Sequence, residues 1–88
     1  MKMIVVILQD DDTDSVSEAL IEAGMPVSRI ASTGGFLRQG RSTLMVGVEK
    51  EKVDDVIQLI DEYCAPTIEP MQRKATLFVL NVEHFEQI

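Results

Sequence analysis

The apolar residues of this chain fall into four short runs that predict β-strands. The first run, Met3 to Leu8, is rich in β-branched residues and uninterrupted, which predicts a central strand buried on both faces. Three further strands are predicted from Pro26 to Ser32, from Thr43 to Val48 and from Ala75 to Val82. The segment Thr33 to Gly40 holds three glycines and predicts a loop. The second and third strands are therefore expected to form an antiparallel hairpin with an extended tip.

Two other segments carry apolar residues at helical spacing. In the first, residues 10–13 offer N-cap candidates, Gly24 follows as the C-terminal stop, and the apolar stripe is Val16, Ala19, Leu20 and Ala23. The second helix is predicted from Glu51 to Tyr63, and its apolar face is Val53, Val56, Ile57, Ile60 and Cys64. A link from Ala65 to Arg73, with two prolines, leads to the last strand.

The resulting order, β-α-β-β-α-β, predicts a ferredoxin-like α+β fold. We expect a four-stranded antiparallel sheet with two helices on one face, and a single domain over residues 1–88. The other face of the sheet has no helix to cover it, although its strands are more apolar than a solvated face allows. We therefore expect that face to contact another subunit.

Composition narrows the class of protein. With 45% hydrophobic and 26% charged residues, the chain is neither disordered nor fibrous. Its longest apolar run is far shorter than the ~20 residues of a membrane span, so no membrane span is expected. The only cysteine, Cys64, cannot form an internal disulfide, which favours a cytoplasmic chain, and its place on the helical stripe predicts a buried structural thiol. The net charge of −7 argues against binding of long nucleic acid.

The charge is unevenly distributed along the chain. Between Glu22 and Glu49 the chain has no acidic residue, but it has three arginines: Arg29, Arg38 and Arg41. We call residues 23–48 the basic segment. Such a segment in an acidic protein would attract a small anion. The alternative is that strands and glycine-rich turns simply contain few carboxylates.

The segment Gly35 to Ser42 satisfies a phosphate-loop pattern with arginine in place of lysine. A strand rather than a helix follows it, so the helix N-terminus that a phosphate loop needs is missing and a nucleotide hydrolase is rejected. The glycine amides, two arginines and the flat Phe36 side chain still suit a phosphate-bearing ligand. A flexible hairpin tip without a ligand remains the alternative.

The acidic cluster at residues 10–14 and His84 are the other candidates for chemistry. The cluster lacks the glycine and glutamate that a calcium loop would need at residues 15 and 21. Helix capping explains it better, and loosely held magnesium remains open. His84 has no nucleophile near it in the sequence, so we expect no catalysis. No cofactor is expected, and no residue is assigned as a metal ligand. A small acyl phosphatase is retained only as an alternative, since an arginine in a phosphate loop could serve one.

Three blocks of sequence resemble the PII-like cyclic di-AMP receptors of bacteria. They are Gln9-Asp10, the segment Ala31 to Gly40 with Thr43 and Gly47-Val48, and the segment Ala75 to Phe85. The resemblance implies a homotrimer of ferredoxin-like subunits whose sheets face the threefold axis. It also implies a nucleotide held in clefts between neighbouring subunits, and a signal relayed to a protein partner. This agrees with the uncovered apolar face expected above.

The glycine loop and the resemblance together give ten candidate ligand-binding residues. They are Ser28, Thr33, Gly34, Gly35, Phe36, Leu37, Arg38, Arg41, Gly47 and Gln87.

Three positions and one loop depart from the family pattern. The asparagine and arginine that the family carries at the start of the second strand are Gly24 and Pro26 here, and an asparagine of the glycine loop is Arg41. The link before the last strand is much shorter than in the family and lacks its Gly-Gly end. Two hypotheses follow: a receptor for cyclic di-AMP or a related ligand, or a structural or protein-interaction trimer that no longer binds nucleotide.

Overall fold

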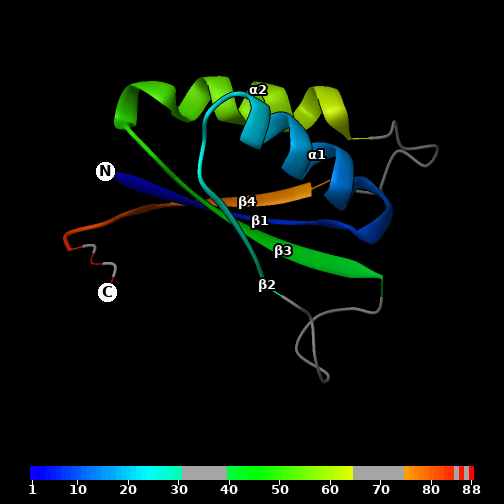
Figure 1. Ribbon diagram of the computed structural model, residues 1–88, viewed down its shortest axis with the longest axis horizontal. Helices are drawn as coiled ribbons and strands as arrows, with labels where there is room; N and C mark the ends of the chain where they lie inside the picture. Colours follow the sequence, from blue (N-terminus) through cyan, green and yellow to red (C-terminus); the bar gives the residue numbers. More distant parts are fainter. Residues whose placement is uncertain (31–39, 65–74, 85, 87) are drawn as a thin grey trace.

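The computed structural model describes residues 1–30, 40–64, 75–84, 86 and 88, and it contains four strands and two helices. In chain order the elements are β1 (Lys2–Gln9), α1 (Asp10–Glu22), β2 (Val27–Ile30), β3 (Arg41–Val48), the 3-10 turn η1 (Lys50–Lys52), α2 (Val53–Tyr63) and β4 (Ala75–Asn81). The strands form one antiparallel sheet in the order β2-β3-β1-β4, and both helices lie on the same side of it (Figure 1). The predicted ferredoxin-like α+β fold is confirmed.

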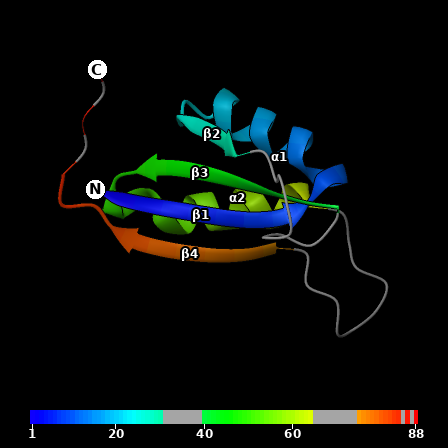
Figure 2. The same cartoon turned by 90° about the horizontal axis from the view of Figure 1, so that it is seen from below.

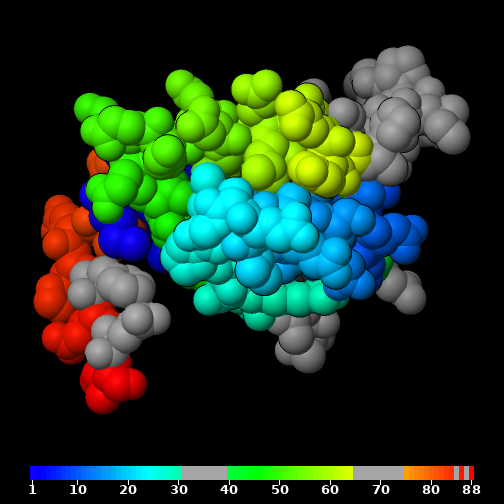
Figure 3. Space-filling view, turned by 45° about the horizontal axis from the view of Figure 1, so that its top comes forward, coloured from blue at the N-terminus to red at the C-terminus, as the bar shows by residue number. Residues whose placement is uncertain are grey.

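The core lies between the sheet and the helices. Alternate residues of β1 face the helices, so Ile4 and Val6 are fully buried and pair with Val46 and Leu44 of β3. The helices contribute the rest of the buried cluster, notably Val16, Leu20, Val56 and Ile60. Figure 2 views the molecule from below, with α2 visible behind the strands, and Figure 3 shows the two helices side by side at the surface. Most residues of the predicted apolar stripes therefore define the layer that joins helices to sheet. Ala23, predicted for the first stripe, is an exception, because it follows the end of α1 and is exposed.

The other side of the sheet, which we call the open face, carries no helix. Its apolar residues come from all four strands and are half-buried or exposed: Met3, Val5, Ile7, Ile30, Met45, Phe78 and Leu80. These residues lie next to one another across the strands. Val5, for example, pairs with Met45 of β3 and with Phe78 of β4. The outermost side chains, Phe78 and Leu80, are 51% and 50% exposed. In an antiparallel sheet with one face in water, the residues on that face are mostly polar.

Several strand boundaries differ from the prediction, including both ends of β1, which runs from Lys2 to Gln9 instead of from Met3 to Leu8. β2 begins at Val27, because Pro26 has no N–H to donate to the ladder, and the predicted end of this strand lies outside the described residues. β3 begins at Arg41, two residues earlier than predicted, since Arg41 and Ser42 still pair with β1 despite their polarity. β4 ends at Asn81 rather than one residue later.

The helix starts also differ. The N-cap of α1 is Gln9, whose side chain makes no capping hydrogen bond, so the prediction that residues 10–13 supply the cap is wrong. The chain passes from β1 into α1 without a connecting residue, so the aspartates lie inside the first turn. There their negative charges still stabilise the helix through its dipole. The hydroxyl of Thr13 instead donates to the Gln9 carbonyl at 3.1 Å. The second helix opens with η1 and becomes α-helical only at Val53.

The apolar stripe of α2 is narrower than predicted. Val56, Ile60 and Cys64 are buried, as expected, and the prediction of a buried thiol is confirmed. Ile57 is 37% exposed and lies at the solvent edge of the stripe. No helix in the described part of the chain is long and apolar enough to cross a membrane.

Candidate ligand site

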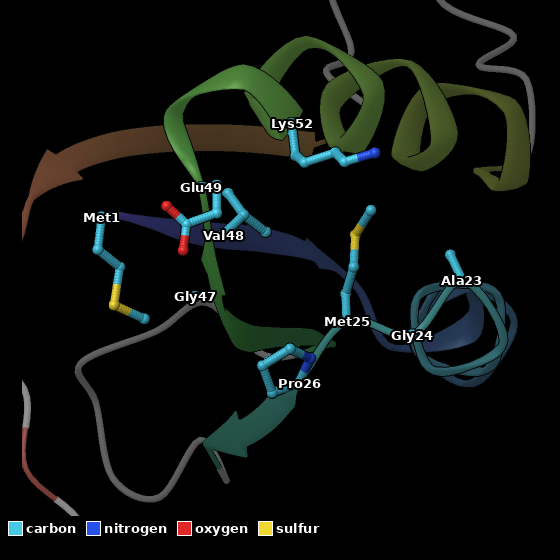
Figure 4. A pocket seen from close by; sticks show the side chains of 9 residues that line it. All are labelled: Met1, Ala23, Gly24, Met25, Pro26, Gly47, Val48, Glu49 and Lys52. Carbon is cyan, nitrogen blue, oxygen red and sulfur yellow. The ribbon is translucent and has the colours of Figure 1, made fainter.

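A pocket of about 370 Å³ lies where the start of β2 meets the end of β3 (Figure 4). Four separate segments of the chain form it, and its lining residues are Met1, Ala23, Gly24, Met25, Pro26, Gly47, Val48, Glu49 and Lys52. The walls are mainly methionine, proline and valine side chains. A volume of this size suits a flat organic group such as a nucleobase.

The wall nearest α1 is built by the end of that helix. Gly24 has φ +83°, and its N–H donates to the Ile21 carbonyl at 2.9 Å. The N–H of Met25 donates to the Leu20 carbonyl at 3.0 Å, which closes the helix in the manner typical of a C-terminal glycine. These two bonds turn the chain so that Met25 packs against the core while Pro26 leads into β2.

Gly47 lines the pocket and lies on the open face of β3. Its φ is outside the left-handed region, so any L-residue could adopt this backbone. A Cβ placed there would meet the Cε atom of Met1 at 2.8 Å and nothing else among the described atoms within 4 Å. Since that atom ends a flexible side chain, folding does not require glycine here. Gly47 is half-buried beneath the Met1 side chain, and without a side chain of its own it lets another molecule approach its backbone closely once Met1 moves aside.

Two opposite charges line the pocket, and they point in different directions. Figure 4 shows the Lys52 side chain extending over Met25 toward α1, and the Glu49 carboxylate turned toward Met1. Both side chains are exposed. The pocket thus combines apolar walls with a cation on one side and a carboxylate on the other.

Three of the ten predicted site residues are described by the structure, and all three lie on the open face. Gly47 lines the pocket. Ser28 is exposed on β2 and pairs with Met45, which makes it a diagonal neighbour of Gly47. Arg41 is half-buried at the start of β3, where it pairs with Gln9. The other seven lie outside the described residues: Thr33, Gly34, Gly35, Phe36, Leu37, Arg38 and Gln87.

The structure does not bring Arg41 to the pocket. Arg41 and Gly47 are six residues apart on one strand, which separates them by roughly 20 Å at the usual rise of a β-strand. Residues 31–39 connect β2 to β3 at the Arg41 end of the hairpin. Of the described site residues, Gly47 and its neighbour Ser28 therefore lie toward one end of β3, and Arg41 lies at the other.

The Arg41 end is attached to the start of α1 by two hydrogen bonds. The N–H of Asp10 donates to the Gly40 carbonyl at 2.8 Å, and the Ser42 hydroxyl donates to the Asp10 carboxylate. These bonds lie on either side of Arg41 and fix its backbone. One charge of the basic segment is already paired, because Arg29 forms an ion pair with Asp14 at 3.1 Å.

Met1, Met25 and Lys52 belong to the pocket but were not predicted from the sequence. They lie in different segments, and nothing in the local pattern distinguishes Lys52 from Lys50, its neighbour on η1. Of the other sequence candidates, His84 is exposed and lies 3.6 Å from Glu86. No group of three or more His, Cys, Asp or Glu side chains in the described ranges is arranged to hold a metal ion.

The fold and this pocket define a ferredoxin-like α+β domain with a ligand-sized cavity at the end of its β2–β3 hairpin. A sequence model of the cyclic-di-AMP receptor family matches residues 1–69, and the chain belongs to this family. The match ends within the short link before β4, yet β4 takes its place beside β1.

A solved structure supports the same fold over the whole chain. It is the crystal structure of a functionally unknown protein from Pediococcus pentosaceus ATCC 25745, which is 32% identical in sequence. The two structures align with a TM-score of 0.77, over 99% of this chain and 96% of that chain. The aligned parts therefore span nearly the full length of both chains, including β4.

Proposed function

We propose that this protein is a PII-like signalling protein that binds cyclic di-AMP or a related small nucleotide. The observation that carries the proposal is the pocket lined by Gly47, a half-buried glycine that lies beneath the flexible Met1 side chain and that folding itself does not require. Apolar walls with one cation and one carboxylate suit a base joined to a phosphate. Membership of the cyclic-di-AMP receptor family supports the same class of ligand.

We further propose that the complete site lies between two subunits. The predicted contacts at Gly47 and Ser28 lie toward one end of β3, whereas the one at Arg41 lies at the other end. One compact ligand can contact both groups if the Gly47 end of one subunit meets the Arg41 end of its neighbour. The separation of about 20 Å within one chain therefore supports a shared site.

The proposed assembly is a homotrimer whose subunits meet through their open faces. The apolar residues of that face are half-buried or exposed in the single chain, and a monomer would leave them in water. The number of three subunits comes from the resemblance to PII-like receptors. Ligand binding would change the loop between β2 and β3, and a cytoplasmic protein partner would recognise the altered surface. Such a signal requires that the ligand prefers one loop conformation.

We assign binding rather than catalysis to the site. The ionisable side chains that line the pocket are one carboxylate and one ammonium group, and no serine, cysteine or histidine lies beside them among its lining residues.

A second candidate is a trimer that has lost nucleotide binding. Gly24 and Pro26 favour it, because they line the pocket without side-chain hydrogen-bonding groups where the family carries asparagine and arginine. The short link before β4 points the same way.

A thermal-shift screen separates the two candidates. A ligand that binds only the folded protein must raise its melting temperature. We expect cyclic di-AMP to raise it, ATP and cyclic di-GMP to raise it less, and the Phe36→Ala/Arg41→Ala double variant to lose the effect. A folded, trimeric protein with no shift for any nucleotide would support the second candidate.

A further inference from the structure

We propose that Lys52 pairs with the phosphate of the nucleotide that occupies the pocket. This inference rests on the proposed function, since it assigns a contact within the same site. Lys52 is the only cationic side chain among the nine residues that line the pocket, and its side chain extends across the pocket over Met25 (Figure 4).

The surroundings of Lys52 leave its charge available to a ligand. Among the described residues no carboxylate lies within ion-pair distance of it, and Glu49 points to the opposite side of the pocket. A phosphate entering between Met25 and Val48 would lose water on its apolar side. Lys52 can offset that loss by donating charge-assisted hydrogen bonds.

The backbone under Lys52 is already ordered. Its N–H donates to the Glu49 carbonyl at 2.9 Å, and Lys52 forms the N-cap of α2. Only the side chain, which is exposed, has to be ordered when it meets a phosphate. The opposite end of the pocket, at Glu49, accepts hydrogen bonds and so suits an exocyclic amino group rather than a second phosphate.

A purely structural role for Lys52 makes a different prediction. The last turn of α1 contains no basic residue, and the Lys52 ammonium points toward that end of the helix. Its charge would then stabilise the helix dipole whether or not a ligand is bound. Removing such a charge would lower stability and would affect all ligands alike.

The test compares Lys52→Ala with Lys50→Ala. The two lysines lie on the same turn and carry the same charge, but Lys50 does not line the pocket. We measure the affinity of each variant for cyclic di-AMP and for adenosine, which has the base and sugar without phosphate, by calorimetry. Lys52→Ala is expected to weaken cyclic di-AMP binding about tenfold or more and to leave adenosine binding unchanged. Lys52→Arg is expected to retain most of the affinity, and Lys50→Ala all of it.

Each other outcome overturns the inference. Equal losses of cyclic di-AMP affinity in Lys52→Ala and Lys50→Ala would mean that the effect comes from the change in net charge and not from a contact with the phosphate. Equal losses for cyclic di-AMP and adenosine would make Lys52 a structural residue. These two results would leave the proposed function intact, provided that the unmutated protein binds cyclic di-AMP. A folded, unmutated protein that binds neither ligand would overturn the proposed function and this contact with it.

Discussion

Gly47 and Gly40 show two different reasons for glycine on the same strand hairpin. Gly40 has φ +86°, a conformation that other L-residues rarely adopt, although a Cβ there would meet nothing within 4 Å. Gly47 has an ordinary strand conformation, and its Cβ would meet only the tip of Met1. Gly40 is therefore needed for the conformation of the backbone turn, whereas Gly47 is a lining residue of the pocket.

Alanine is expected to act on stability at position 40 and on nucleotide binding at position 47. Gly40→Ala should lower the free energy of unfolding by about 1 kcal/mol through backbone strain. Gly47→Ala should leave that free energy within about 1 kcal/mol of the unmutated value, because the Met1 side chain can move aside. It should nevertheless weaken nucleotide binding, since the methyl group is added to a residue that lines the pocket. Denaturant unfolding and calorimetric titration of both variants measure the two effects. Unchanged nucleotide affinity in Gly47→Ala would remove Gly47 from the site.

Some residues of the candidate site could be predicted from the sequence and others could not. Gly47 and Ser28 were found through the resemblance, and the structure places them as neighbours across β2 and β3. Lys52 and Met25 were not found, because the pocket is formed only when the turn after α1 and the turn after β3 come together. No local periodicity carries that information.

At the scale of elements, the apolar pattern predicted each helix and strand of the described residues, together with some of their ends, such as Val48 for β3 and Tyr63 for α2. Other ends differ. Runs such as 3–8 and 75–82 are apolar enough to give the strand directly. The ends depend on pairing, so Arg41 and Ser42 join β3 because β1 extends opposite them. The start of α1 depends on the direct junction with β1, which removes the residue that would otherwise carry a capping side chain.

Helix α2 offers a test of how its apolar face is divided. Ile60 is 1% exposed in the core, whereas Ile57, three residues earlier, is 37% exposed. Ile60→Ala should lower the free energy of unfolding by about 2–5 kcal/mol, because it leaves a cavity in the core. Ile57→Ala should cost less than about 1.5 kcal/mol, since its side chain remains partly in water. Chemical denaturation of the two variants gives the comparison. Equal costs would mean that Ile57 is covered, as the sequence alone predicted, and that a second subunit contacts α2.

At the scale of the whole molecule, the central question is what covers the open face. Phe78 and Tyr63 are aromatic residues of similar exposure, 51% and 50%, on opposite layers of the molecule. Phe78 lies on the open face of β4, whereas Tyr63 ends α2 on the helical layer. This pair allows the open face to be tested against a matched surface position.

A charge on the open face is expected to separate the subunits. Phe78→Glu should convert a particle of three times the 9.8 kDa chain mass into single chains, because a carboxylate would be buried in an apolar interface. Tyr63→Glu should leave the assembly intact. Light scattering coupled to gel filtration measures both masses. An intact trimer in Phe78→Glu would place the subunit interface elsewhere.

The sequence predicted the unpartnered face of the sheet correctly, and the reason is physical. Alternate residues of the strands are apolar on both sides, and two helices can cover only one side of a four-stranded sheet. The described candidate residues Gly47 and Arg41 lie at opposite ends of β3. The proposed site therefore combines residues from two subunits, which no pattern along one chain predicts.

Calorimetric titration of the unmutated protein with cyclic di-AMP tests the central claim most directly. The account predicts micromolar or tighter binding with one ligand per subunit, and weaker binding of ATP and cyclic di-GMP. The Gly47→Ala variant, which is expected to fold normally, serves as the control for binding at the pocket. A folded protein of trimeric mass that gives no heat with cyclic di-AMP, ATP or cyclic di-GMP would contradict the account.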